Sequence, residues 1–328
     1  MKVGKLDSEL LRKIVFNNIT LHRDEVLVRP GIGEDCGVID FGEYACVMST
    51  DPITGAANEV GRLAVHISCN DVASSGVQPL GLMLTIMVPE GTKAEEIDLI
   101  MKQAGEEAAK LNVEIIGGHT EITSAVNRVI VSSTAIGRQT KSKVIHTSGA
   151  KLGDSVVMTK NLGLEGTAII AHDWEDKLKN VLGKDVVQKA KDMLKDISVV
   201  TEGVIAGEIG VTSMHDITEG GLLGAIWEMC EASQTGVKIY KHKVKITLET
   251  KKICDYFKID PFRLISSGCM LMTVSKEKEA ALLKALGEKG VDASVIGEVI
   301  KEERYLVDGE KEIKMMAPES DELYKVTM

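Results

Sequence analysis

The sequence predicts an α/β protein with mixed sheets that is divided into two domains, and three observations lead to this prediction. Short apolar runs of strand character alternate with segments of helical periodicity along the chain. Strand pairs with hairpin-like spacing occur at both ends, which favours mixed sheets over all-parallel ones. The 328 residues suffice for two domains, and a polar, Gly-containing run at 147–154 interrupts the pattern. We therefore expect domains at residues 1–148 and 149–328.

The first half begins with a predicted helix over Ser8–Asn17 and a Gly-rich loop. A buried strand, Ala45–Ser49, leads into a turn at Thr50-Asp51-Pro52. Apolar residues surround the helical wheel of Glu59–Ser74, so this helix should be buried on most sides, although it carries Asn70 and Asp71. The remaining predicted elements are a strand Leu82–Val88, a helix that starts with a Thr92/Glu95 capping box, a strand Val113–Ile116 that ends at Gly117-Gly118, and a strand Arg128–Ile136.

The second half repeats a strand-then-helix order. Its predicted strands are Ser155–Thr159, Met270–Val274 and Ser294–Val299. Its predicted helices are Asp185–Leu194, Val199–Ile209, Leu222–Ser233 and Lys276–Lys289, and a turn spans His215–Gly221.

Composition excludes several classes of function. The formal charge is −10 and aromatic residues make up only 3% of the chain, which argues against a nucleic-acid partner. The six cysteines are scattered without zinc-ligand or disulfide spacing, so we expect a cytoplasmic protein. The uncharged stretch Val72–Pro89 contains Ser, Gly, Gln and Pro, which predicts a turn and a buried strand rather than a membrane span.

Familiar nucleotide and hydrolase motifs are missing. The sequence has no G-x-x-x-x-G-K-[ST] loop and no G-x-S-x-G elbow. The segment Gly31–Cys36 departs from the G-x-G-x-x-G fingerprint at its last position. A P-loop NTPase, a simple dinucleotide-dependent dehydrogenase and an α/β-hydrolase are therefore disfavoured.

Acidic residues at strand ends and inside apolar helices are the main functional signal. Carboxylates in apolar surroundings are costly unless they are paired or bound to a cation. Several carboxylates in one cleft would suit Mg²⁺, which also binds phosphate oxygens. The sequence therefore predicts a metal–nucleotide site. The candidates are Asp35 after Gly31 and Gly33, Asp51, Asp71, Glu121 after Gly117-Gly118-His119-Thr120, and Asp216 before Gly220-Gly221.

Each candidate also fits an ordinary structural role when it is taken singly. Asp35 and Asp51 suit turns, and Gly220-Gly221 suits the start of a helix. Asn70 and Asp71 can pair within a core, and His119 and His215 can be satisfied histidines near loops. Cys36 and Cys69 resemble small buried hydrophobic residues.

The order of these motifs resembles the aminoimidazole ribonucleotide synthetase (PurM-like) superfamily, and within it the HypE-type hydrogenase-maturation proteins. The likeness covers nearly the whole chain. The matching segments are Gly4-Lys5-Leu6, Gly33–Val38, Thr50-Asp51-Pro52, Asn70–Ala73 with Gly76 and Pro79, Gly117–Glu121, Gly149–Asp154, His215–Leu222 and Ser267-Gly268.

The resemblance implies a two-domain subunit whose N-terminal sheets pair into a dimeric β-barrel, so that the protein is a homodimer. It implies ATP and Mg²⁺ as cofactors and phosphoryl transfer to a small-molecule or partner-borne acceptor. By residue matching, Asp35, Asp51, Asp71 and Asp216 would hold the metal, and Asp71 and Asp216 would act in catalysis. Gly33, Asn70, Gly117, Gly118, His119, Thr120, Glu121, Gly220 and Gly221 would bind the nucleotide.

The sequence also departs from the resembling proteins. Glu34 and Cys36 replace the usual residues of the G-D-D-A segment. The HypE pattern has a terminal Cys that carries the carbamoyl group, whereas residues 318–328 contain none, so we expect no such modification there. Two alternatives stay open: a small-molecule kinase that resembles thiamine-monophosphate kinase, and a non-catalytic ATP-binding maturation or scaffold protein.

Overall fold

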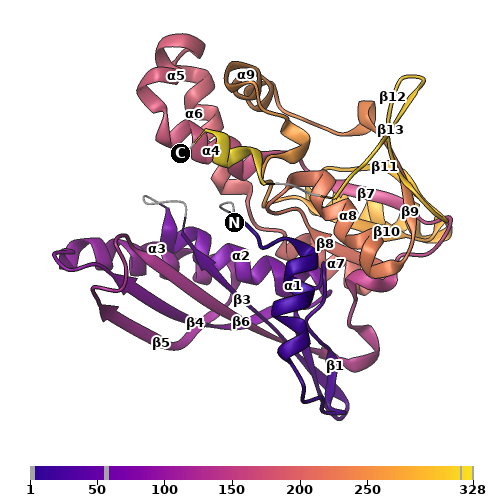
Figure 1. Cartoon of the computed structure of the whole chain (residues 1–328), viewed down its shortest axis with the longest axis horizontal. Coiled ribbons are helices and arrows are strands. Elements are labelled where there is room, and N and C mark those ends of the chain that lie inside the picture. Colours follow the sequence, from indigo (N-terminus) through magenta and orange to yellow (C-terminus); the bar gives the residue numbers. More distant parts are fainter. Residues whose placement is uncertain (1–3, 55–58, 318–319, 327–328) are drawn as a thin grey trace.

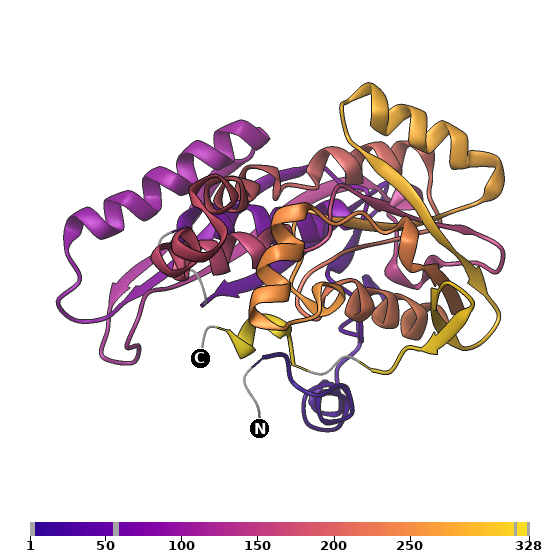
Figure 2. The same ribbon diagram turned by 90° about the horizontal axis from the view of Figure 1, so that it is seen from above.

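The computed structural model describes residues 4–54, 59–317 and 320–326. Two mixed sheets divide it into an N-terminal and a C-terminal half, which lie side by side in Figure 2. The sheets span residues 26–140 and 155–314, on either side of the predicted boundary at 148/149. The boundary itself stays a prediction.

The N-terminal sheet has six strands in the order β1-β2-β3-β6-β4-β5. Only the β4–β5 pair is parallel. The strands are β1 (Val26–Val28), β2 (Gly37–Phe41), β3 (Tyr44–Ile53), β4 (Pro79–Val88), β5 (Glu114–Ile122) and β6 (Ile130–Thr140). Helices α2 (Val60–Ser74) and α3 (Ala94–Leu111) cover one face of this sheet, and no described helix covers the other (Figure 1).

The C-terminal sheet has seven strands in the order β13-β12-β9-β11-β7-β10-β8. All its pairs are antiparallel except β12–β9. The strands are β7 (Ser155–Thr159), β8 (Ser213–Asp216), β9 (Gly236–Tyr240), β10 (Met270–Val274), β11 (Ala293–Ile300), β12 (Arg304–Asp308) and β13 (Lys311–Lys314).

The remaining helices belong mostly to the C-terminal half. They are α1 (Ser8–Ile14), α4 (Leu164–Asp173), α5 (Glu175–Leu182), α6 (Lys184–Asp192), α7 (Val200–Ile209), α8 (Gly221–Ser233), α9 (Leu248–Phe257) and α10 (Lys276–Glu288). Across the described part of the chain, no helix combines the length and the apolar character needed to cross a bilayer.

Helix α2 joins the two halves. It packs on β3, β6 and α3 on one side and on α7 and β8 on the other. The contact with α7 requires Gly203, because a Cβ there would lie 2.2 Å from the carbonyl oxygen of Ala73. Nearly all its residues are buried, as the apolar pattern predicts. The helix therefore carries Asn70 and Asp71 into the junction between the halves.

Four local predictions are wrong. The strand Ala45–Ser49 does not end before Asp51, because β3 continues to Ile53 and pairs Asp51 with Ser133 of β6. The strand from Val113 does not stop at the glycines either, since β5 continues to Ile122. His215 and Asp216, the first two residues of the predicted turn, instead end strand β8.

The fourth error concerns the start of α3. Thr92 and Glu95 do not form the predicted capping box. The Thr92 hydroxyl donates to the Pro89 carbonyl over 2.8 Å, and the Lys93 N–H donates to Glu96 Oε1 over 3.3 Å. The true helix start is therefore one residue later than the sequence pattern indicates.

Candidate functional site

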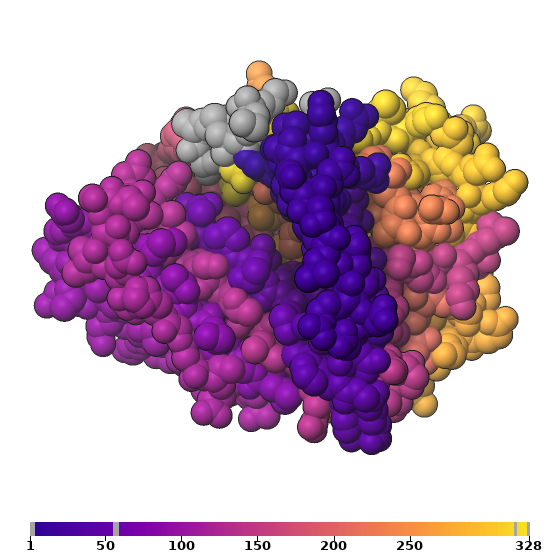
Figure 3. Space-filling view, turned by 60° about the horizontal axis from the view of Figure 1, so that its bottom comes forward, coloured from indigo at the N-terminus to yellow at the C-terminus, as the bar shows by residue number. Residues whose placement is uncertain are grey.

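A cavity of about 660 Å³ lies between the two halves. Its walls come from the N-terminal segment, the loop before β2, strand β3 and helices α2 and α4, together with residues 218–219, 265–267 and 323–324. In Figure 3 the surface is hollowed beside the indigo N-terminal segment, where the two halves meet. The loop before β2 provides Asp35, β3 provides Asp51 and α2 provides Asp71, and all three carboxylates line the cavity.

Asp216 lies at the end of β8, behind this wall. The residue has no solvent exposure, and neither of its carboxylate oxygens has a hydrogen-bond partner among the described residues. Burial and the nearby charge of Asp35 raise the pKa of Asp216 to about 8. A buried carboxylate without a hydrogen-bond partner destabilises a fold unless a proton or a cation neutralises its charge.

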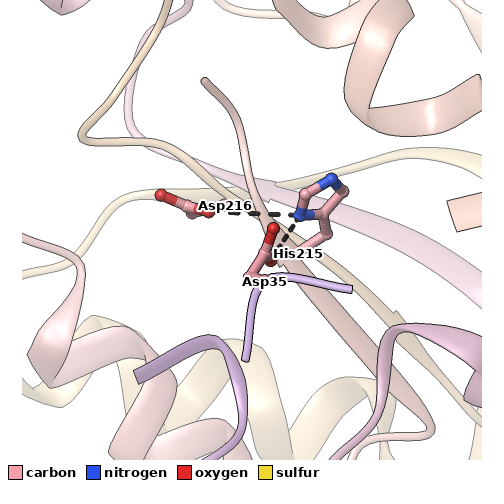
Figure 4. Close-up of side chains that lie close together, drawn as sticks. All are labelled: Asp35, His215 and Asp216. Carbon is pink, nitrogen blue, oxygen red and sulfur yellow. Dashed lines mark hydrogen bonds and ion pairs between the residues drawn. The ribbon is translucent and has the colours of Figure 1, made fainter. Parts of the chain in front are cut away.

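His215 organises the carboxylates around Asp216. Its Nδ1 lies 2.6 Å from Asp35 Oδ2 and its Nε2 lies 2.9 Å from Glu228 Oε2. Figure 4 shows Asp35 and Asp216 converging on Nδ1. Burial alone would lower the pKa of His215, but Asp35 and Glu228 together hold this pKa well above its usual range. The imidazolium donates to both carboxylates, and it therefore positions Asp35 rather than acting as a metal ligand.

Asp71 shares its environment with the other carboxylates. Its Oδ2 accepts a hydrogen bond of 2.5 Å from the Ser49 hydroxyl. Burial, followed by the charges of Asp216 and Asp51, raises the pKa of Asp71 well above its ordinary value. A divalent cation would relieve this repulsion and restore the ionised forms.

The donor set fits Mg²⁺. Carboxylate oxygens from four chain segments converge, and Mg²⁺ takes hard oxygen ligands while keeping positions for water and phosphate. Ligand oxygens of Asp35 and Asp216 lie within 4.8 Å of each other, and Asp71 is close enough to Asp216, Asp51 and Asp35 for their charges to raise its pKa. The structure thus brings together all four aspartates that the sequence analysis assigned to the metal. Their binding of a metal stays a prediction.

The residues that were predicted to bind the nucleotide do not all lie in the same part of the fold. Gly33 has φ +78° and lies against the backbone of Glu228 on α8. Gly220 and Gly221, both with positive φ, precede and begin α8, and the Gly220 N–H donates to Asp321 over 2.6 Å. Asn70 is fully buried and bridges Ile197 and Val199. The Gly220 N–H and the Asn70 amide thus already have protein partners.

Gly117, Gly118, His119, Thr120 and Glu121 lie on β5, at the edge of the N-terminal sheet. They are exposed and are not among the residues that line the cavity. His119 and Glu121 pair with Thr85 and Met87 of β4. Within one chain, this group does not reach the carboxylates.

Sequence reasoning did not identify several polar residues of the site. Ser49 holds Asp71, and Glu228 holds His215 and lies 3.6 Å from the Lys5 ammonium. Glu165 and Ser267 line the cavity from the C-terminal half. A carboxylate flanked by glycines, as in Gly163-Leu164-Glu165-Gly166, was the available signal for Glu165.

Two family models match the chain. The N-terminal domain model of AIR synthase related protein matches residues 33–139, and the C-terminal domain model matches residues 151–309. The chain belongs to the AIR synthase related family. The resemblance to this family and to HypE-type proteins that the sequence motifs indicated is thereby confirmed, because similar proteins include HypE and hydrogenase expression/formation proteins.

Two relatives show the extent of this likeness. A putative hydrogenase expression/formation protein of Methanocaldococcus jannaschii is 31% identical over 315 residues, which is 93% of this chain and 90% of that protein. A carbamoyl dehydratase HypE of Bradyrhizobium diazoefficiens is 27% identical over 284 residues, 84% of this chain and 80% of that protein.

Solved structures show the same fold. A chain of a HypE–HypF complex superposes with a TM-score of 0.78 at 22% identity, covering 94% of this chain and 99% of that one. HypE in complex with ATP gives 0.69 at 19% identity, covering 99% and 98%. AaThiL, a ThiL protein complexed with AMPPCP and TMP, gives 0.71 at 17% identity, covering 94% and 95%. The expected two-domain PurM-like α/β fold with mixed sheets is confirmed.

Proposed function

We propose that this protein is a HypE-like enzyme that uses Mg²⁺ and ATP to transfer a phosphoryl group to a carbonyl- or amide-type oxygen of an acceptor. The observation that carries the proposal is Asp216, whose buried carboxylate lacks a hydrogen-bond partner, lies beside Asp35 and raises the pKa of nearby Asp71. The cation that would satisfy Asp216 is the one that a triphosphate brings with it.

The four aspartates would hold the metal in the cavity wall. Bound there, Mg²⁺ would neutralise charge on the transferred phosphoryl group. His215 fixes Asp35, and Ser49 fixes Asp71, so both carboxylates keep one orientation. Asp71 and Asp216 are our candidates for the catalytic carboxylates. The solved complexes of related folds with ATP and with AMPPCP support a nucleotide in the cavity.

We also propose that the protein is a homodimer, paired through the uncovered face of the N-terminal sheet into a β-barrel. Large hydrophobic residues are exposed on its strands, among them Tyr44, Leu80, Met83 and Ile116. Such apolar exposure is typical of an interaction surface. In this arrangement, residues 117–121 would reach a nucleotide across the interface, which accounts for their distance from the carboxylates of their own chain.

The acceptor distinguishes two versions of this function. The HypE relatives are carbamoyl dehydratases and one HypE structure contains HypF, which supports an amide-type acceptor, small or borne by a partner protein. The fold is also that of a ThiL protein solved with AMPPCP and TMP, which supports a small-molecule kinase as the second candidate. Both versions suit a cytoplasmic enzyme without nucleic-acid or membrane partners.

Isothermal calorimetry with ATP tests the proposal. We expect binding that requires Mg²⁺ and is lost in Asp216→Asn, whereas Glu121→Gln, on the exposed edge strand, alters binding only in the dimeric protein. Absence of ATP and ADP binding at millimolar nucleotide would refute the proposed function. With labelled ATP, release of the label as inorganic phosphate after transfer favours the amide-type acceptor, and a stable phosphorylated product favours the kinase. Binding without any turnover favours a scaffold protein.

A further inference from the structure

Three aromatic rings surround one ammonium group in the C-terminal half. The Nζ atom of Lys177, on α5, lies 4.5 Å from the centroid of the Trp174 ring. It lies 5.7 Å from the centroid of Tyr256 and 5.9 Å from that of Phe257, at the end of α9. Both helices lie at the top of Figure 1. Such a cluster is unexpected in a chain that is only 3% aromatic, and we call the three rings the aromatic cage.

The rings of the aromatic cage are held by contacts that do not involve Lys177. The centroids of Trp174 and Phe257 are 5.7 Å apart, and those of Tyr256 and Phe257 are 4.9 Å apart with nearly perpendicular planes. The Trp174 indole N–H donates to the Val326 carbonyl over 3.2 Å. All three rings are partly buried against the hydrophobic core of this region. The aromatic cage is therefore preformed, and a different cation can occupy it without a change of fold.

Lys177 differs from the other cations that lie over aromatic rings. In the described part of the chain, each of the others lies over one ring: Arg138 over Tyr44, Lys243 over Tyr240 and Arg304 over Trp227. Lys177 lies over three rings, and no carboxylate of the described residues forms an ion pair with it. Glu175, two residues earlier, pairs with Lys179 and Lys191 instead. Ring faces therefore take the place of a carboxylate for this exposed ammonium.

Ring faces suit a methylated ammonium better than the ammonium of lysine. The lysine group is compact, strongly hydrated and carries three N–H donors that ring faces cannot satisfy as water does. Methylation keeps the positive charge and replaces N–H groups by apolar methyl groups. Aromatic cages are used to bind such groups, as in the recognition of choline and methyl-lysine. The group that fits this aromatic cage best is therefore not the one that it now holds.

Acidic residues border the aromatic cage. Asp173 and Asp255 precede Trp174 and Tyr256 in the sequence, Asp176 precedes Lys177, and all three aspartates are exposed. Their negative charge favours a cation over a neutral apolar ligand. The aromatic cage and its acidic border thus point to the same class of ligand.

We propose that Trp174, Tyr256 and Phe257 form a binding site for a methylated ammonium group. The proposal does not depend on phosphoryl transfer in the cavity between the halves. The methylated group has two possible sources, which the experiment separates. One is a separate molecule that displaces the Lys177 ammonium. An exposed cation–π contact favours the occupied state only about two- to fivefold, so this displacement is inexpensive.

The other source is Lys177 itself, methylated by a sulfonium methyl donor. The Lys177 ammonium loses a proton to solvent, and its nitrogen attacks the methyl carbon of the donor. The new N–C bond forms as the C–S bond breaks, and a neutral thioether leaves. The product keeps one positive charge and stays within reach of the same rings.

The binding experiment uses choline as the probe with full-length protein that carries Trp227→Phe, so that Trp174 is the sole tryptophan. Quenching of its fluorescence reports on the aromatic cage directly. Choline should bind to the Lys177→Gln variant about two- to fivefold more tightly than to the parent, because the internal cation no longer competes. The uncharged isostere 3,3-dimethylbutan-1-ol should bind at least fivefold more weakly than choline. No choline binding by Lys177→Gln, or equal binding of the two ligands, would overturn the proposal.

Ring substitutions locate the bound choline. In the Lys177→Gln background, Tyr256→Leu and Phe257→Leu should each weaken choline binding at least threefold, since an apolar side chain remains but a ring face is lost. The matched control Tyr240→Leu removes a ring that lies under one lysine only, Lys243, and should leave choline binding unchanged. Two ring variants are used so that one remains if the other fails to fold. Unchanged choline binding in the folded ring variants would place the choline elsewhere and overturn the proposal.

Reductive methylation with ¹³C-formaldehyde separates the two sources. It produces dimethyl-lysine, and the NMR signal that is missing in the Lys177→Arg variant belongs to Lys177. Methyl groups over ring faces should give a signal upfield of the other dimethyl-lysines, whereas Lys179, identified through Lys179→Arg, should show no such shift. If choline leaves the upfield signal in place, Lys177 is the source of the methylated group. If choline abolishes the shift, or no shift occurs and choline still binds, the source is a separate molecule.

Discussion

The Nδ1 atom of His215 lies 2.6 Å from Oδ2 of Asp35, which joins a strand of the C-terminal half to a loop of the N-terminal half. Glu228 holds the other ring nitrogen, so the imidazolium is fixed from both sides. Asp216, the next residue along β8, is then held beside Asp35 without a partner of its own. The contact between the two halves therefore leaves the buried Asp216 carboxylate without a hydrogen-bond partner among the described residues.

Asp216→Asn should stabilise the protein when Mg²⁺ is absent, because it removes a buried carboxylate. The folded-state pKa of about 8 lies above the unfolded value of about 3.9. The folded state therefore holds a proton that the unfolded state releases, and wild-type stability falls as pH rises from about 4 to about 8. The advantage of the variant should grow over that range and level off above it, as measured by thermal unfolding in EDTA.

The same variant should lose its response to magnesium. A ligand present at 100 times its dissociation constant stabilises a protein by about 2.7 kcal/mol. Mg²⁺ should raise the melting temperature of the wild-type protein and leave that of Asp216→Asn unchanged. An equal rise in both proteins would remove Asp216 from the metal site.

Asp71→Asn should lower phosphoryl transfer by about 10²- to 10³-fold, because a charge that orients the metal and phosphates is lost. Ser49→Ala removes only the hydrogen bond to Asp71 Oδ2 and should reduce kcat less, with little change in the ATP dissociation constant. Single-turnover kinetics with labelled ATP measure the rate of phosphoryl transfer in both variants. Turnover by Asp71→Asn at the wild-type rate would favour a scaffold protein that binds ATP without using Asp71.

Strands and helices with strong apolar patterns were predictable from the sequence, and the junction between the halves was not. The predicted bounds of β7 and β10 are confirmed, because each is an apolar run that is buried on both faces. The last two residues of β8, His215 and Asp216, were predicted to lie in a turn, because both are polar where a buried strand usually carries apolar residues. A strand is therefore difficult to predict from its sequence pattern where polar residues occupy its end.

The candidate site was predictable in part for a similar reason. Four aspartates stood out because carboxylates are rare in apolar segments, and the fold brings them together. Their partners Ser49 and Glu228 have no sequence signal, since a serine in a strand and a glutamate on a helix are ordinary. Contacts between distant segments decide their roles.

Gly118→Ala should destabilise the protein by about 3 kcal/mol, the upper end for overpacking. A Cβ at Gly118, where φ is +150°, would lie 1.9 Å from the Leu84 carbonyl oxygen of β4. Gly117 is the matched control, because a Cβ there meets no atom within 4 Å. Denaturant unfolding should show Gly117→Ala within about 1 kcal/mol of the wild type. Equal effects of the two variants would contradict the close approach of β4 and β5.

Glu107→Gln should destabilise the α2–α3 contact at neutral pH by about 2 kcal/mol, because the buried His66 and the partly buried Arg62 are left without their carboxylate. The hydrogen bond from His66, with Lys110 and Arg62 nearby, lowers the pKa of Glu107 to about 2. This stability is present above the unfolded pKa of about 4.3 and is lost as pH falls towards 2. The difference between wild type and variant in urea titrations should therefore shrink between pH 4.5 and 2. A difference that is constant with pH would point to packing instead.

Asn70→Ala should act on stability rather than on nucleotide binding. The Asn70 amide donates to the Ile197 carbonyl over 2.9 Å and accepts from the Val199 N–H over 2.9 Å. Loss of the amide leaves two buried backbone groups of the C-terminal half without a hydrogen bond. Each unpaired group should lower the free energy of unfolding by about 1–3 kcal/mol. Asn18→Ala, which removes one exposed hydrogen bond to Ile14, should change stability by no more than about 0.5 kcal/mol. Calorimetry could instead show that Asn70→Ala weakens ATP binding tenfold at unchanged stability. In that case Asn70 binds the nucleotide, as the sequence predicts. Its hydrogen bonds between the two halves must then rearrange when the nucleotide binds.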